Sequence, residues 1–181
     1  MRFRLHPPRF SALLGLILAL AVSACGSAPQ RGVGLSAPLE CVPFARALSG
    51  VNLRGDAPDW WSQAEGRYER GETPQVGSVM VFEPKSGLPH GHLAVVSKVV
   101  SQREILVTQA NWVHHRVTTD QLAIDVSPEG DWSEVRVWWP PSDVLGSTVY
   151  PILGFIYSGY AASHDRIVQA VPGAVRVALE N

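Results

Sequence analysis

Residues 91–112, GHLAVVSKVVSQREILVTQANW, contain two apolar runs on either side of a short polar segment. The runs 93–100 and 105–110 are rich in Val and Leu, and the polar residues 101–104 between them are typical of a turn. This stretch therefore predicts a β-hairpin made of two neighbouring antiparallel strands.

The segments on both sides of the hairpin predict the class of the fold. Two short helical patterns come first, at 41–49 and at 60–65, and Asp59 is the expected N-cap of the second. Helices first and antiparallel strands afterwards predict an α+β domain. The further β-rich runs on which this prediction rests are 76–84, 122–126, 134–139 and 152–157.

The first 24 residues predict an export signal. They have three arginines among the first nine residues, continue with an apolar run over 12–22 and end in small residues. The run is too short for a membrane-spanning helix. Residues 22–25, Val-Ser-Ala-Cys, resemble the bacterial lipobox, in which the cysteine becomes the lipidated first residue of the mature protein. Cleavage after Ala24 without lipidation is the alternative.

The lipobox resemblance implies that Cys25 carries the lipid anchor. Gly26 follows it instead of an aspartate, which in Gram-negative lipoproteins implies delivery to the outer membrane. Residues 26–38 are rich in Gly, Ser, Ala and Pro, a composition that favours a flexible tether. We therefore expect a signal peptide over 1–24, an anchor and tether over 25–38, and a domain that faces the periplasm.

The charge balance indicates which partners not to expect. The chain has 15 Lys and Arg against 16 Asp and Glu. Removal of the three leader arginines leaves 12 basic against 16 acidic residues, a net charge of −4. Such a balance predicts no basic face, so nucleic acid is not an expected partner.

Cys41 is the only other cysteine of the chain. If Cys25 is lipidated, Cys41 is an unpaired thiol in an oxidising compartment. It begins the helical pattern that has Pro43 in its first turn and stops at Gly50. We expect the positive end of the helix to lower the thiol pKa from its usual value of about 8.5, which favours a nucleophile. A disulfide with Cys25 or an inert buried thiol is the alternative.

A thiol nucleophile needs a histidine as base and a polar group that fixes the tautomer of that histidine. His92 is the preferred base because it opens the first strand of the predicted hairpin, and His90 is expected to line the cleft beside it. Asn111, at the end of the second strand, is expected to accept the other imidazole N–H. Gln109 lies on the same strand face and is the alternative, either as orienter or as oxyanion donor.

The order of these residues resembles the CHAP domain, the cysteine- and histidine-dependent amidohydrolase/peptidase module of the papain-like cell-wall hydrolases. The resemblance spans residues 39–157 and implies a papain-like fold, with N-terminal helices packed on an antiparallel sheet or small half-barrel. The residues that carry it are Glu40-Cys41 with Phe44 and Ala45, then Trp61, the strand VGSVMVF, the segment His90-Gly91-His92-Leu93-Ala94-Val95-Val96, and Gln109-Ala110-Asn111-Trp112.

The resemblance also implies roles. Cys41 matches the family's nucleophile and His92 its general base and later acid, with no metal or cofactor. Many members have a glutamate where this chain has Gln109, so a negatively charged orienter is absent, while Asn111 is kept. Trp61, His90 and Trp112 lie in these motifs and are possible cleft residues. The backbone N–H of Cys41 is expected to stabilise the oxyanion.

The implied substrate is peptidoglycan. Family members cleave either the bond between muramic acid and L-alanine or an amide within the stem peptide or cross-bridge. A lipoprotein in the periplasm would face this polymer directly. The sequence thus predicts a cysteine amidase or endopeptidase of the cell wall.

Two other readings of the same residues remain open. The first is a zinc site formed by His90 and His92 with the adjacent pair His114 and His115. A catalytic zinc site usually needs three well-placed ligands. The second is an inactive peptidoglycan-binding or structural lipoprotein on the same scaffold. Its basis is the neutral Gln109 and six tryptophans that can either stack on glycan or pack in the core.

The last residues, 158–181, have no assigned chemistry. The sequence from 164 onward predicts a helix broken around Pro172-Gly173, either packed on the domain or mobile.

Overall fold

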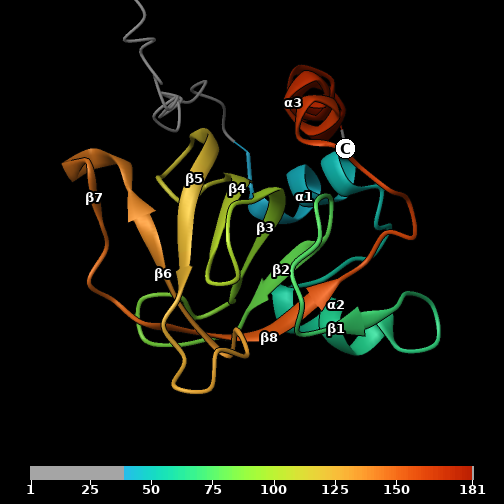
Figure 1. Ribbon diagram of the computed structural model, residues 1–181. Coiled ribbons are helices and arrows are strands. Elements are labelled where there is room, and N and C mark those ends of the chain that lie inside the picture. Colours follow the sequence, from blue (N-terminus) through green and yellow to red (C-terminus); the bar gives the residue numbers. More distant parts are fainter. Residues whose placement is uncertain (1–38, 181) are drawn as a thin grey trace, which may run out of the picture.

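The computed structural model describes residues 39–180 (Figure 1). The predicted signal peptide, the anchor at Cys25 and the tether lie outside this part of the chain. The described elements run in the order α1 (Cys41–Ser49), α2 (Ala57–Ala64), β1 (Arg70–Gly71), β2 (Val79–Phe82), β3 (His92–Val99), β4 (Glu104–Ala110), β5 (Val117–Asp125), β6 (Glu134–Trp139), the 3₁₀ turn η1 (Pro140–Ser142), β7 (Val144–Leu145), β8 (Tyr150–Ile156) and α3 (His164–Leu179).

The strands form one antiparallel sheet in the order β1-β8-β2-β3-β4-β5-β6-β7. An additional pairing of β6 with β8 brings the two halves of the sheet together, so the sheet curls into a small barrel. The predicted hairpin is confirmed as β3 and β4, in which Val96 pairs with Val107. The α+β class is confirmed as well.

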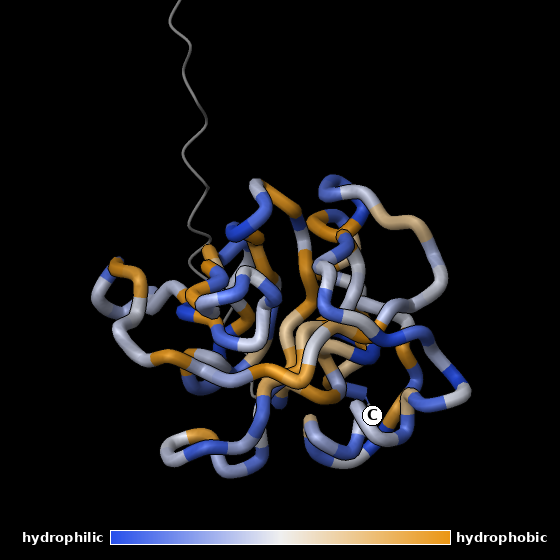
Figure 2. Tube along the Cα trace, turned by 60° about the horizontal axis from the view of Figure 1, so that its bottom comes forward, coloured by the Kyte–Doolittle hydropathy of each residue, from blue (hydrophilic) through white to orange (hydrophobic). Residues whose placement is uncertain are grey.

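Alternation along β3 separates two apolar cores. Leu93 and Val95 face the helices and belong to the helix-side core, whereas Ala94 and Val96 face the interior of the sheet and belong to the barrel core. Figure 1 shows α1 and α3 together beside the sheet, and Figure 2 shows hydrophobic residues following the central strands. A strand buried on both faces explains the nearly continuous apolar run from which the hairpin was predicted.

The C-terminal helix differs from the prediction. We expected a break at Pro172, but α3 continues through this residue to Leu179. Its apolar face packs into the helix-side core that also contains Phe44, Ala45 and Leu48 of α1. This packing offsets the hydrogen bond that proline cannot donate within a helix. The buried residues of this face are Ile167, Val171, Ala174 and Ala178.

Two local predictions also need correction. The N-cap of α2 is Asp56, and Asp59 is the third helical residue, whose carboxylate accepts a hydrogen bond from the Asp56 backbone N–H at 2.9 Å. This reciprocal capping box starts the helix earlier than the sequence suggested. Strand β5 begins at Val117 rather than at residue 122. Among residues 39–180, no helix has the length and apolar character needed to cross a membrane.

Candidate functional site

Cys41 begins α1, and its position is fixed by the packing of that helix. Phe44, Ala45 and Leu48 are buried in the helix-side core, so the first turn of α1 is held against β3. The thiol is free and half-buried. The backbone N–H of Leu93, the residue that follows His92, interacts with the thiol and favours its charged form. The start of the helix and the start of β3 therefore meet at the thiol.

The environment of Cys41 raises the pKa of its thiol. Burial is the largest cause, because it disfavours the charged thiolate. The Leu93 N–H acts in the opposite direction, and the nearby Glu40 carboxylate raises the pKa further. Our expectation of a lowered pKa at the helix N-terminus was wrong for this structure, because burial outweighs the backbone N–H groups of the helix. The group is a thiol at neutral pH.

His92 lies at the beginning of β3 and is 3% exposed. The glycine before it is required there, since Gly91 has φ +64° and an added Cβ would lie 2.4 Å from the Phe82 carbonyl oxygen. The imidazole is enclosed by aromatic rings. Its centroid lies 5.5 Å from that of Phe82, in an edge-to-face arrangement, and 5.1 Å from that of Trp112.

Gln109 of β4 is the polar partner of this histidine. The His92 Nε2–H donates to Gln109 Oε1 at 3.0 Å, inside the fold. With its proton on Nε2, the neutral ring leaves the Nδ1 lone pair as its basic site. Burial lowers the pKa of His92 to about 4, although the bond to Gln109 acts in the opposite direction. At neutral pH the site therefore combines a thiol with an uncharged imidazole.

Asn111 does not hold the imidazole as the sequence suggested. Its backbone has φ +62°, a left-handed conformation that takes it out of the strand. The amide then turns toward α1, where Asn111 Nδ2 donates to Glu40 Oε2 at 2.7 Å. Its oxygen accepts the backbone N–H of His115 at 2.9 Å. Asn111 thus joins the segment after β4 to the residue that precedes the thiol.

The three expected cleft residues occupy different places. Trp112 lies against the His92 ring and also contacts Tyr150, with ring centroids 5.1 Å apart. His90 is exposed and paired with the Asp56 carboxylate at 2.8 Å. Trp61 lies under the Arg70 guanidinium, 4.8 Å from the ring centroid, and is packed against β8. Of the three, only Trp112 contacts the proposed base.

Sequence reasoning missed three residues that shape the site. Glu40 was quoted as part of the motif but given no role, although its place beside Cys41 was the available signal. Phe82 is the register partner of His92, a relation that follows only from the pairing of β2 with β3. Tyr150 comes from the distant strand β8, and no local signal indicates it.

The histidines expected in the alternative zinc site are separated by their partners. His92 is bonded to Gln109 and His90 to Asp56, while the exposed rings of His114 and His115 stack on each other with centroids 3.7 Å apart. Within residues 39–180 no group of three or more His, Cys, Asp or Glu side chains is arranged to hold a metal ion.

The geometry agrees with one comparison to known proteins. Residues 31–111 match the model of the CHAP domain family. The matched range includes Cys41, His92, Gln109 and Asn111. No curated protein matches the chain. The match supports a CHAP domain, a type of domain that generally hydrolyses amides or peptides of peptidoglycan with a cysteine and a histidine.

Proposed function

We propose that this chain hydrolyses an amide bond of peptidoglycan, as an N-acetylmuramoyl-L-alanine amidase or as an endopeptidase of the stem peptide or cross-bridge. The observation that carries the proposal is the arrangement at the start of β3. Here the Cys41 thiol interacts with the N–H of Leu93, and the adjacent His92 is bonded to Gln109. The match to the CHAP domain family supports this chemistry.

In the proposed reaction, His92 Nδ1 takes the thiol proton as Cys41 Sγ attacks the amide carbonyl carbon. The resulting imidazolium gives this proton to the leaving amine, and the C–N bond breaks to leave a thioester. Water activated by His92 then hydrolyses the thioester and restores the thiol. The backbone N–H groups of Cys41 and Val42 at the free end of α1 are the proposed oxyanion donors.

The structure shows no hydrogen bond between the thiol and the imidazole. Catalytic hydrogen bonds of this kind are often long in the unliganded state and tighten when substrate binds. Movement of the thiol from the Leu93 N–H toward His92 is the adjustment that the mechanism requires.

The proposal includes the cellular setting that the sequence suggests. Signal peptide 1–24 is removed, Cys25 carries the lipid, and residues 26–38 tether the domain to the outer membrane. The domain then faces peptidoglycan in the periplasm. Radiolabelled fatty acid should enter the full chain but not the Cys25→Ser variant.

Digestion of purified sacculi tests the enzymatic claim. We would compare the chain from residue 25 carrying Cys25→Ser, hereafter the exported form, with its Cys41→Ala variant and with Ser62→Ala, an exposed change on α2. The exported form and Ser62→Ala should release fragments, and mass spectrometry of these fragments identifies the bond that is cut. Cys41→Ala should release none. Equal, empty profiles for the exported form and Cys41→Ala would reject the hydrolase proposal.

A second candidate function is binding of peptidoglycan without turnover. It is favoured by the raised pKa of Cys41, by the lowered pKa of His92, and by the neutral Gln109 that leaves the imidazolium without a counter-charge. In this case the exported form would sediment with sacculi but release no fragments. The same experiment therefore separates the two functions.

A further inference from the structure

A pocket opens at the end of β3 that is farthest from His92. It has a volume of about 580 Å³, within the range of small-ligand sites. Since β3 runs from His92 to Val99, the two places are roughly 20 Å apart at about 3.3 Å per residue. The pocket is lined by Glu72, Thr73, Pro74, Val99, Ser101, Gln102, Gly130, Asp131 and Trp132.

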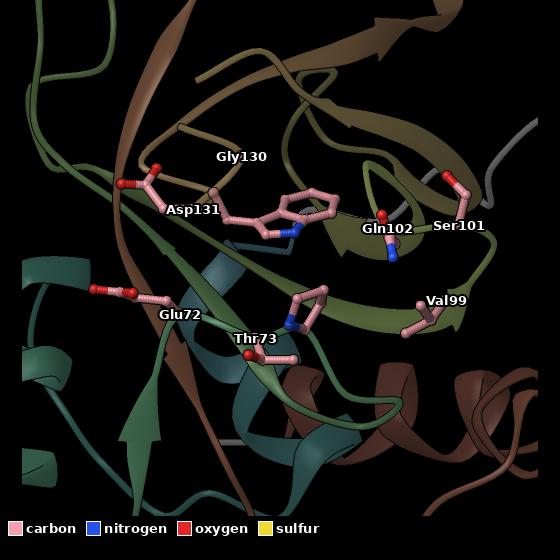
Figure 3. Close-up of a pocket in the computed structure, with 9 residues that line it drawn as sticks. Glu72, Thr73, Val99, Ser101, Gln102, Gly130 and Asp131 are labelled. Carbon is pink, nitrogen blue, oxygen red and sulfur yellow. The ribbon is translucent and has the colours of Figure 1, made fainter. Parts of the chain in front are cut away.

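Negative charge lies on one side of this pocket. In Figure 3 the carboxylates of Glu72 and Asp131 lie on one side, whereas Ser101 and Gln102 lie on the other. Hydrogen bonds from Ser133 to the Asp131 carboxylate lower the pKa of that carboxyl group, so it stays ionised. Two charged acceptors of hydrogen bonds therefore lie on the same side of the pocket.

The residues that line the pocket do not neutralise these carboxylates. None of the nine lining residues is basic. The Arg103 guanidinium lies behind Gly130 and is already engaged by Asp125, at 3.6 Å from Nε to Oδ2, and by the carbonyl of Ser127. Neither Glu72 nor Asp131 has an ion-pair partner within residues 39–180. A ligand would have to supply the counter-charge.

The pocket also has an apolar, aromatic part. Trp132 is 4% exposed and is anchored edge-to-face on Phe155, with centroids 5.9 Å apart. No hydrogen bond joins its indole N–H to another of residues 39–180, and Trp132 is one of the residues that line the pocket. Pro74 and Val99 add aliphatic surface. An alkyl chain can pack on such a surface while its charged end stays at the carboxylates.

We propose that this pocket binds a peptide side chain of the lysine type, with a primary ammonium group at Glu72 and Asp131 and its alkyl chain against Trp132. A backbone carbonyl of the same peptide would accept the Trp132 N–H. Such a site lets the domain hold a peptide-bearing polymer or partner at a second point, which raises its overall affinity. The inference does not rest on the chemistry proposed for Cys41.

Titration of the ¹⁵N-labelled exported form with Nα-acetyl-lysine N-methylamide tests this proposal. Signals of Gln102, Gly130 and the Trp132 indole N–H should shift, with saturation in the millimolar range for a single exposed subsite. Raising the salt concentration should weaken binding, because the carboxylates are accessible to solvent. The Cys41→Ala variant should bind equally, which separates failure here from failure of the hydrolase proposal.

Matched variants and probes make the test specific. Glu72→Gln and Asp131→Asn should each weaken binding about two- to five-fold, and Glu180→Gln, an exposed change at the end of α3, should leave it unchanged. In Asp131→Asn the amide oxygen can still accept the hydrogen bonds from Ser133, so the turn is preserved. No shift with the lysine probe, or equal shifts with its Nζ-acetylated form or with an N-acetylglucosamine oligosaccharide, would overturn the proposal.

Discussion

The two ends of β3 differ in how they treat charge. At the His92 end, the titratable ring is 3% exposed, enclosed by Phe82 and Trp112, and bonded to the neutral Gln109. At the Val99 end, Glu72 and Asp131 line an open pocket. At the His92 end, desolvation disfavours the charged form of the ring. At the Val99 end, Coulomb attraction of the carboxylates favours the binding of a cation.

This difference teaches that the reactivity of the thiol depends on enclosure. Burial is the largest cause of the raised pKa of Cys41 and of the pKa of about 4 for His92, so both groups are uncharged at neutral pH. An uncharged pair can act by general-base transfer during attack, but it is not a preformed ion pair.

The largest effect is expected when the enclosed base is removed. His92→Ala should lower the rate of sacculus hydrolysis about 1,000-fold, as is usual for the loss of a general acid–base group. His164→Ala is the matched control. His164 begins α3 and is bonded to Asp120 of β5. Fragment release per unit time measures both variants. If His92→Ala kept the full rate, His92 would have no catalytic role.

Acid should lower the free energy of unfolding of the domain, because His92 is buried in its neutral form. The ring has a pKa of about 4 when folded and 6.5 when unfolded, so the unfolded chain binds the additional proton as the pH falls. Stability that is present above pH 6.5 is thus lost toward pH 4, by about 3 kcal/mol in total. Urea unfolding at several pH values measures this loss. The His92→Gln variant should lose less over the same interval, and an identical loss would contradict the assignment.

A negative charge placed beside the buried His92 should change the reactivity of the Cys41 thiol. Gln109→Glu is expected to raise the pKa of His92 and favour an imidazolium–thiolate pair, so that iodoacetamide alkylates Cys41 about ten-fold faster at pH 7. The hydroxyl of Thr118, the strand partner of Gln109, is buried without a hydrogen bond and is available to the new carboxylate. Gln121→Glu, another buried change, is the control. Slower alkylation in Gln109→Glu would contradict this view.

The smallest effect is expected at the exposed residue before the thiol. Glu40→Gln removes a charge that raises the pKa of Cys41, while an amide oxygen can still accept the Asn111 bond. Alkylation at pH 7 should become about two-fold faster, since exposed charges act weakly. Glu65→Gln at the end of α2 should have no effect. A slower reaction of Glu40→Gln would show that the Glu40 charge helps the thiol.

Local patterns predicted much of the fold. The apolar runs gave the β3–β4 hairpin and the α+β class, and the position of Cys41 at a helix start and of His92 at a strand start followed from sequence. The continuous α3 was not predictable from Pro172 alone, because packing of its apolar face on α1 decides the outcome. The two-residue strands β1 and β7 are too short for a periodic signal.

The orientation of the site depended on contacts between distant segments. Gln109 and Asn111 share a face in an ideal strand, and only the left-handed backbone of Asn111 with its bond to Glu40 separates their roles. The pKa of Cys41 could not be judged from its helix position, because burial by several elements outweighs the helix end. The pocket at the Val99 end of β3 is lined by three connections that lie far apart in the sequence, at 72–74, 99–102 and 130–132.

Capture of the covalent intermediate tests the central claim most directly. The exported form would be mixed with soluble muropeptides, stopped with acid during the first turnovers, and digested for mass spectrometry. We predict an acyl group on the peptide that contains Cys41 and no product from the Cys41→Ala variant. Release of the same products by Cys41→Ala, or turnover with Cys41 never acylated, would contradict the account.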